Sequence, residues 1–83
     1  AACGPVLYLR GMHNAEARVD QARDANAKWH APYEFHLAEA YLKQARIEAA
    51  EASYEDAIHY ARVAEEFSAR AIGITAAQRQ VEQ

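Results

Sequence analysis

Few side chains in this chain have the types and spacing that chemistry requires. The side chains that bind transition metals most readily are four histidines, His13, His30, His36 and His59. A di-metal site in a helical bundle needs paired Glu-x-x-His elements together with glutamates on facing helices. The sequence holds no Glu-x-x-His, and Asp56-x-x-His59 is a single substitute for it. We therefore expect solvated histidines and no metal site.

A nucleophilic mechanism is no better supported. A serine or cysteine nucleophile needs a base held at a fixed position beside it. Ser53 lies where a helix is expected to begin and is better explained as its N-cap. Ser68 falls on a stripe of small residues, and Cys3 lies at the start of the chain, away from any rigid partner. We expect no catalytic residue, no cofactor and no enzymatic activity.

The composition favours helices and argues against nucleic-acid binding and against a membrane-spanning helix. The chain has 83 residues, enough for one domain. Its net charge of −3 leaves no basic field for nucleic acid. No apolar run approaches the ~18 residues that indicate a membrane-spanning helix. Alanine is abundant, and the chain contains only three glycines and two prolines, a composition typical of helical proteins.

Apolar residues that recur at spacings of three and four predict three helices. The first covers residues 13–29, and its stripe is Met12, Ala15, Val19, Ala22, Asn26 and Trp29. The second covers residues 32–51, and its stripe is Ala31, Phe35, Ala38, Leu42, Ala45, Ala49 and Ala52. The third covers residues 53–80, and its stripe is Tyr54, Ala57, Ala61, Ala64, Ser68 and Ala71.

Two turns are expected to separate these helices. Pro32 disfavours helical backbone at Ala31 and suits the first position of the following helix. The turn near residues 51–53 rests on Ser53, which is followed three residues later by Asp56 in a capping pattern. The alternative is one uninterrupted helix over residues 33–80 that pairs with another chain. Gly73 is expected to fray or kink the last turns of the third helix.

Three helices with short connections predict an all-α fold, an antiparallel three-helix bundle. Residues 13–83 form this helical domain, and residues 1–12 form a tether ahead of it. The stretch that begins at Tyr54 resembles a tetratricopeptide helical hairpin, although a second copy of that ~34-residue repeat is missing. We therefore expect the bundle to be built on a single tetratricopeptide-like hairpin.

Four residues are candidates for an interaction surface. Trp29 and Tyr33, near the first turn, are residue types enriched in interface hot spots, and the alternative is that they cap the end of the core. Ile72 and Ile74 fall off the main stripe of the third helix and would be available to a second chain. We therefore expect a homo-oligomer, most simply an antiparallel dimer.

The only cysteine, Cys3, has neighbours that suggest a role for it. Ala1-Ala2-Cys3-Gly4 is similar to the end of the lipobox of bacterial lipoproteins and the residue that follows it. That resemblance implies that a precursor is cut before Cys3, that its sulfur carries a lipid, and that residues 1–12 hold the domain close to a membrane. Enteric lipoproteins of the inner membrane carry aspartate after the cysteine, so Gly4 implies the outer membrane. The alternative is a chance cysteine in a disordered start.

Residues 31–71 resemble a family of alanine-rich helical bacterial proteins classed as a domain of unknown function. The matching features are Ala31-Pro32-Tyr33-Glu34, the Ala-x-x-Tyr-Leu that contains Tyr41, and the Tyr-x-x-Ala-x-x-x-Ala that begins at Tyr54. Members of that family are typically lipoproteins or exported proteins, and in some a peptidoglycan-binding domain similar to that of outer-membrane protein A follows. Family turns often carry Gly-Asp where this chain has Ala52-Ser53.

The resemblance implies a non-catalytic, lipid-anchored protein of the bacterial envelope that faces the periplasm. Its work would be contact with another envelope protein, as a scaffold or interaction module, or with further copies of itself. The alternative is a soluble helical bundle that binds a small ligand or a metal.

Overall fold

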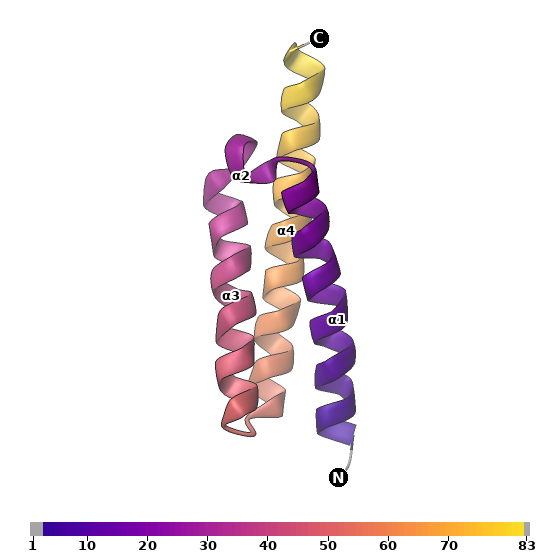
Figure 1. The fold of residues 1–83 in the computed structure, drawn as a ribbon, viewed down its shortest axis with the longest axis vertical. Helices are drawn as coiled ribbons and strands as arrows, with labels where there is room; N and C mark the ends of the chain where they lie inside the picture. The colour runs from indigo at the N-terminus through magenta and orange to yellow at the C-terminus, as the bar shows by residue number, and fades with distance from the viewer. Residues whose placement is uncertain (1–2, 83) are drawn as a thin grey trace.

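Almost all of the described chain is helical (Figure 1). The computed structural model describes residues 3–82, and of Cys3 the backbone alone. Its elements are α1 (Cys3–Asp24), α2 (Ala27–His30), α3 (Pro32–Ala50) and α4 (Tyr54–Glu82). No strand occurs within residues 3–82. The prediction of an all-α fold is confirmed, with four helices in place of the three expected.

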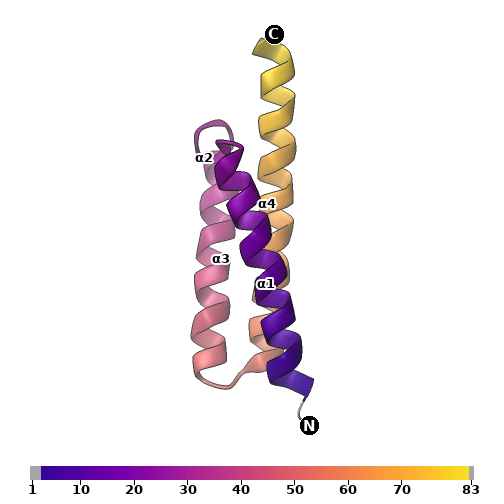
Figure 2. The same cartoon turned by 45° about the vertical axis from the view of Figure 1, so that its right-hand side comes forward.

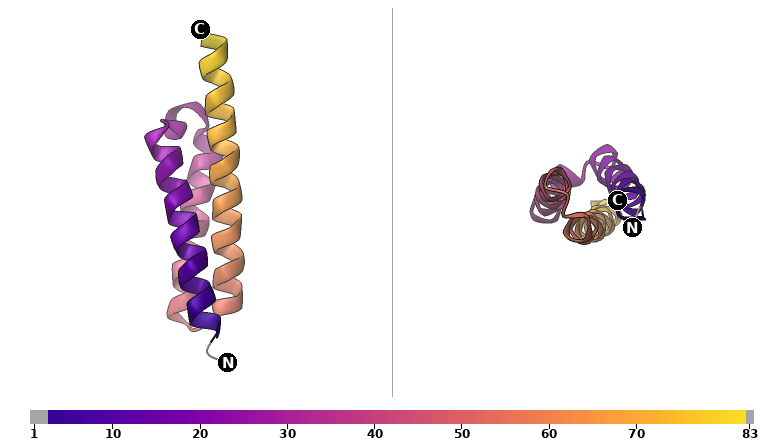
Figure 3. Two further views of the ribbon diagram at one scale, coloured as in Figure 1. Left: turned by 90° about the vertical axis from the view of Figure 1, so that its right-hand side faces the viewer. Right: turned by 90° about the horizontal axis from the view of Figure 1, so that it is seen from below.

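The three long helices lie side by side in an elongated bundle, in which α4 contacts both α1 and α3 extensively. Figure 1 and Figure 2 show α1 and α4 running in one direction and α3 in the other. The molecule measures 52 × 17 × 15 Å along its principal axes. The last turns of α4 extend past the ends of the other helices (Figure 3).

The first helix begins at Cys3, well before the predicted start at residue 13. Pro5 lies in its first turn, where the backbone N–H groups have no partner within the helix, so the missing N–H of proline costs no hydrogen bond. Gly11 lies inside the helix and is tolerated there. Residues 3–12, which were expected to form a tether, therefore continue the bundle as regular helix.

The first helix also ends earlier than predicted, because Asn26 breaks it. Asn26 adopts left-handed backbone angles, φ 66° and ψ 30°, which asparagine tolerates better than most residues. The chain then makes the single helical turn α2 and bends again at Ala31, whose φ is −141°. This change of direction takes Trp29 off the predicted stripe, and its side chain is 82% exposed.

The predicted turn between the second and third helices is confirmed, with different chemistry. Ala52 has a left-handed φ of 61°, its N–H donates to the Ala49 carbonyl at 2.9 Å, and the Ser53 N–H donates to the Glu48 carbonyl at 2.8 Å. This pattern is a Schellman motif at the end of α3. Because the Ser53 N–H is already bonded, Asp56 cannot accept it as the capping pattern requires. The Ser53 carbonyl accepts the first helical bond, from Ala57 at 2.9 Å.

The last helix runs without interruption from Tyr54 to Glu82. The expected fraying or kink at Gly73 is absent from the described part of this helix, and the predicted start at 53 and end at 80 are each within two residues of the observed bounds. Its Gly73 faces open space, with no atom within 4 Å of an added Cβ. Tertiary packing of the preceding turns keeps the backbone helical through this residue.

The core is built from small residues on all three long helices. The predicted stripes supply most of it, and the buried apolar residues are Met12, Ala15, Val19, Ala22, Ala27, Ala31, Phe35, Ala38, Leu42, Ala45, Ala57, Ala61, Ala64 and Ala71. Ser68 and Thr75 extend the stripe of α4, and the Thr75 hydroxyl donates to the Ala71 carbonyl at 2.8 Å. Alanine lets the helix axes approach closely, and Phe35 provides the largest fully buried side chain.

Candidate functional site

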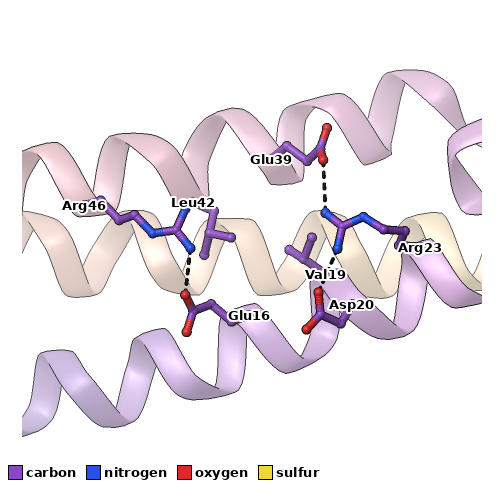
Figure 4. Close-up of a pocket in the computed structure, with 7 residues that line it drawn as sticks. All are labelled: Glu16, Val19, Asp20, Arg23, Glu39, Leu42 and Arg46. Atoms are coloured by element: carbon purple, nitrogen blue, oxygen red, sulfur yellow. Dashed lines mark hydrogen bonds and ion pairs between the residues drawn. The ribbon is translucent and has the colours of Figure 1, made fainter.

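A groove with a charged rim runs between α1 and α3, with α4 behind it (Figure 4). Its volume is about 540 Å³. Val19 of α1 and Leu42 of α3 form the apolar part of its lining. The charged side chains around them are Glu16, Asp20, Arg23, Glu39 and Arg46. The groove exists because α1 and α3 pack mainly on α4 and only sparsely on each other.

Two arginines bridge the groove. The Arg46 Nη2 atom lies 2.6 Å from Oε2 of Glu16. Arg23 reaches Oδ1 of Asp20 at 2.7 Å on its own helix and Oε2 of Glu39 at 3.2 Å on α3. These side chains are roughly half exposed, so each pair stabilises the fold by less than about 1 kcal/mol. Their main effect is to fix how α1 and α3 are aligned.

The charged residues of the groove were not among the predicted site residues, although the sequence carries a signal for them. Glu16 and Arg23 lie three residues before and four residues after Val19. Glu39 and Arg46 lie at the same offsets from Leu42. When two helices with this shared pattern run in opposite directions, the acid of each meets the base of the other.

The chemistry available in the groove is limited to charge and shape. No histidine, cysteine or serine lines it, and each of its carboxylates is paired with an arginine. Across the side chains that the structure describes, no group of three His, Cys, Asp or Glu is placed to hold a metal ion. His36 lies beside the rim, with its Nδ1 3.7 Å from Oε1 of Glu39. A partner would meet a charged rim over an apolar floor.

The four residues predicted as an interaction surface differ in exposure. Trp29 is 82% exposed and Tyr33 is 69% exposed, so neither caps the core. They belong to α2 and to the first turn of α3, at the end of the bundle from which α4 projects (Figure 1). Ile74 is 37% exposed, whereas Ile72 packs against the core. Trp29, Tyr33 and Ile74 are therefore available to a partner, and Ile72 is mostly occupied.

A second exposed apolar region lies at the opposite end of the molecule, on the first turns of α1. Val6, Leu7 and Leu9 are 58%, 49% and 65% exposed. Between them Tyr8 turns inward, with its ring centroid 6.0 Å from that of Tyr54, and burial raises the pKa of the Tyr8 hydroxyl above its usual value. The predicted lipidation concerns the Cys3 side chain and its neighbours Ala1 and Ala2, which lie outside the described residues.

None of the helices formed by residues 3–82 combines the length and the apolar character that crossing a membrane requires. Comparisons with curated proteins and with solved structures gave no match to this chain. Residues 11–83 match the family described as a domain of unknown function, DUF4398. The match covers most of the chain. It includes α2, α3 and α4 and all of α1 except its first turns. The protein therefore belongs to the DUF4398 family.

Proposed function

We propose that this protein is a lipid-anchored component of the bacterial envelope that works by contact, as a scaffold or interaction module, and not by catalysis. It would be held in the outer membrane through a lipid on Cys3 and would face the periplasm. The observation that carries the proposal is the group of exposed apolar side chains directly after that cysteine, Val6, Leu7 and Leu9.

These residues are well placed to meet a lipid surface. Because α1 begins at Cys3, no flexible linker separates the proposed anchor from the bundle. At 1.5 Å per helical residue, Leu9 lies only about 9 Å along the axis from Cys3. Exposed apolar side chains at that depth gain free energy by entering the boundary between headgroups and acyl chains. The lipid and the first turns of α1 would then both bind the membrane.

The distal end of the molecule is the proposed contact surface. With 22 residues, α1 carries the chain about 33 Å away from the anchor. Trp29 and Tyr33 are exposed at that end, and both are residue types that dominate binding energy in protein interfaces. We propose that an antiparallel three-helix bundle with a tetratricopeptide-like hairpin of α3 and α4 presents them to another envelope protein.

A soluble bundle that binds a small ligand or a metal is the alternative function. The groove between α1 and α3 is the feature that favours it. Its arginines and carboxylates already pair with one another across the groove, so a charged ligand would have to displace these ion pairs. The groove is also open to solvent along its rim, whereas ligand pockets usually bury most of the ligand surface.

The proposal is tested by following the full-length gene product in its native organism. The mature protein is expected to begin at Cys3, to carry a lipid detectable by mass spectrometry, and to fractionate with outer membranes. Cys3→Ser should accumulate unprocessed or soluble protein. Gly4→Ala is a suitable control, because a Cβ at this position meets Tyr54 at an ordinary contact distance of 3.5 Å. An unmodified thiol on the native protein would rule out the anchor.

A further inference from the structure

The longest helix carries two apolar stripes on different sides. The small residues of its first stripe face the core of the bundle. The second, here called the outer stripe, recurs at alternating spacings of three and four and consists of Tyr60, Val63, Phe67, Ile74, Ala77 and Val81, with the charged Arg70 at one of its positions. Tyr60, Phe67, Ile74 and Val81 are each seven residues apart. A heptad repeat of this kind is typical of a helix that packs along another helix.

Only the first half of the outer stripe is covered within the molecule. The ring of Tyr41, on α3, stacks against Tyr60 and Phe67 with centroid separations of 5.9 Å in both pairs. The covering helix then ends, because α3 has 19 residues against 29 in α4. Ile74 is 37% exposed and Val81 is 81% exposed. The stripe thus continues onto the projecting turns of α4, where its exposure rises toward the end of the helix.

We propose that a second copy of this chain covers the projecting half of the outer stripe, with the two α4 helices antiparallel. The heptad spacing of the stripe identifies the occupant as a helix. The shape of the molecule favours the same chain, because α4 projects as a step beyond the bundle (Figure 3). A second copy that runs in the opposite direction places the projecting turns of its own α4 beside that step. Each copy then covers the projecting half of the other's outer stripe. This inference goes beyond the proposed function and gives a geometry to the antiparallel dimer that the sequence predicts.

Charge selects the antiparallel orientation. In a parallel pair, Arg70 would face Arg70 of the second copy. A heptad repeat has two kinds of stripe position, which alternate along the helix. In an antiparallel coiled coil, a position of one kind faces a position of the other kind. Ile74 therefore faces Ala77 of the second copy, and Val81 faces its Arg70. Val81 carries no charge, so the antiparallel pair avoids the contact between two arginines that the parallel pair would make, and the two-fold symmetry avoids it at both ends of the contact. Arg70 already lies along the stripe, with its guanidinium carbon 4.9 Å from the Phe67 ring centroid.

Sedimentation equilibrium of the purified chain with Cys3→Ser tests the association. A reversible dimer is expected at high micromolar concentration. Ile74→Glu and Val81→Glu should each raise the dimer dissociation constant at least tenfold while leaving the helical content of the monomer unchanged. Ala76→Glu is the matched control, since this exposed residue lies on the opposite side of α4 from the stripe, and it should leave the dissociation constant within twofold. A strictly monomeric mass, or equal effects at positions 74 and 76, would overturn the inference.

Cross-linking then tests the orientation. Chains with Ile74→Cys and chains with Ala77→Cys, each with Cys3→Ser, should form disulfides with one another when mixed and oxidised. Disulfides between two Ile74→Cys chains at a similar rate would indicate a parallel pair and contradict the proposal. Both experiments use purified protein without membranes, so their failure would leave the proposed lipid anchor to its own test, and failure of the anchor would leave the dimer standing.

Discussion

At the scale of single residues, two left-handed backbone conformations decide where helices end. Asn26 and Ala52 have φ values of 66° and 61°. Asparagine adopts this conformation at little cost, whereas for alanine the Cβ atom makes it unfavourable by about 1 kcal/mol or more. Ala52 is therefore a strained residue in an otherwise regular turn. The surrounding hydrogen bonds of Ala52 and Ser53 to α3 hold it in place.

Replacing Ala52 by glycine is expected to stabilise the protein. Glycine relieves the strain but loses more conformational entropy on folding, so the net gain should be about 0.5–1 kcal/mol in the free energy of unfolding. Ala50→Gly is the matched control, because Ala50 lies in the last turn of α3 and should lose up to about 1 kcal/mol of stability. Urea denaturation of both variants measures the two shifts. A shift of the same sign in both would contradict the strain at Ala52.

At the scale of helices, the groove residues act as an alignment device between α1 and α3. The two bridging ion pairs, Arg46 with Glu16 and Arg23 with Glu39, join helices that contact each other much less than either contacts α4. Arg23 also lies over the ring of the buried Phe35, with its guanidinium carbon 5.7 Å from the ring centroid. The groove therefore owes its shape to electrostatic pairing at its rim and to aliphatic side chains at its floor.

A double-mutant cycle on Glu16 and Arg46 measures this alignment. Glu16→Gln and Arg46→Met should each destabilise the fold slightly, and their coupling should be about 0.5–1 kcal/mol at low salt, because both side chains are about half exposed. Raising the ionic strength should reduce the coupling. The same cycle on Arg46 and Asp20, which do not contact each other in the ion pairs of the groove, serves as the control. Equal coupling in both cycles would argue against a specific bridge.

The helices also show what periodicity determines and what it leaves open. Spacings of three and four placed nearly all the buried residues correctly, because burial on one side of a helix imposes that spacing. Both boundaries of the first helix were wrong, because the helix runs through Pro5 and Gly11, at positions where a helix tolerates these residues, and ends before the left-handed Asn26. Ser53 does precede the first residue of α4, but the bond expected from its N–H to Asp56 is replaced by a bond to the Glu48 carbonyl. That turn is set by the left-handed backbone of Ala52. This conformation depends on how α3 and α4 pack, and alanine as a residue type does not indicate it.

The candidate site was less predictable than the fold. Exposure of Trp29 depends on the bend at Asn26, which the stripe pattern did not reveal. Pairing across the groove depends on the mutual alignment of two helices, which periodicity within one helix does not specify. The shared offsets of Glu16 and Arg23 about Val19, and of Glu39 and Arg46 about Leu42, would have indicated that alignment. The charge patterns of two helices taken together thus carry information on their alignment that the periodicity of either helix alone does not.

At the scale of the whole molecule, a narrow bundle with an alanine core depends on few large side chains. The molecule is only 17 × 15 Å across, and most of its buried residues are alanines, each of which removes little apolar surface from water. A chain of this size is expected to have a total stability of about 4–12 kcal/mol. Phe35, 1% exposed, is its largest fully buried side chain.

Phe35→Ala should therefore remove a large share of the total stability. Truncation of a buried phenylalanine loses its transfer free energy and leaves a cavity, with a combined cost of about 3–5 kcal/mol. Tyr33→Ala is the matched control two residues away, since that ring is 69% exposed and its removal should change the free energy of unfolding by no more than about 0.5 kcal/mol. Thermal and urea unfolding give both values. If the two variants unfold at the same denaturant concentration, the stability of the bundle does not depend on the ring of Phe35, and the alanine seams alone must hold the helices together.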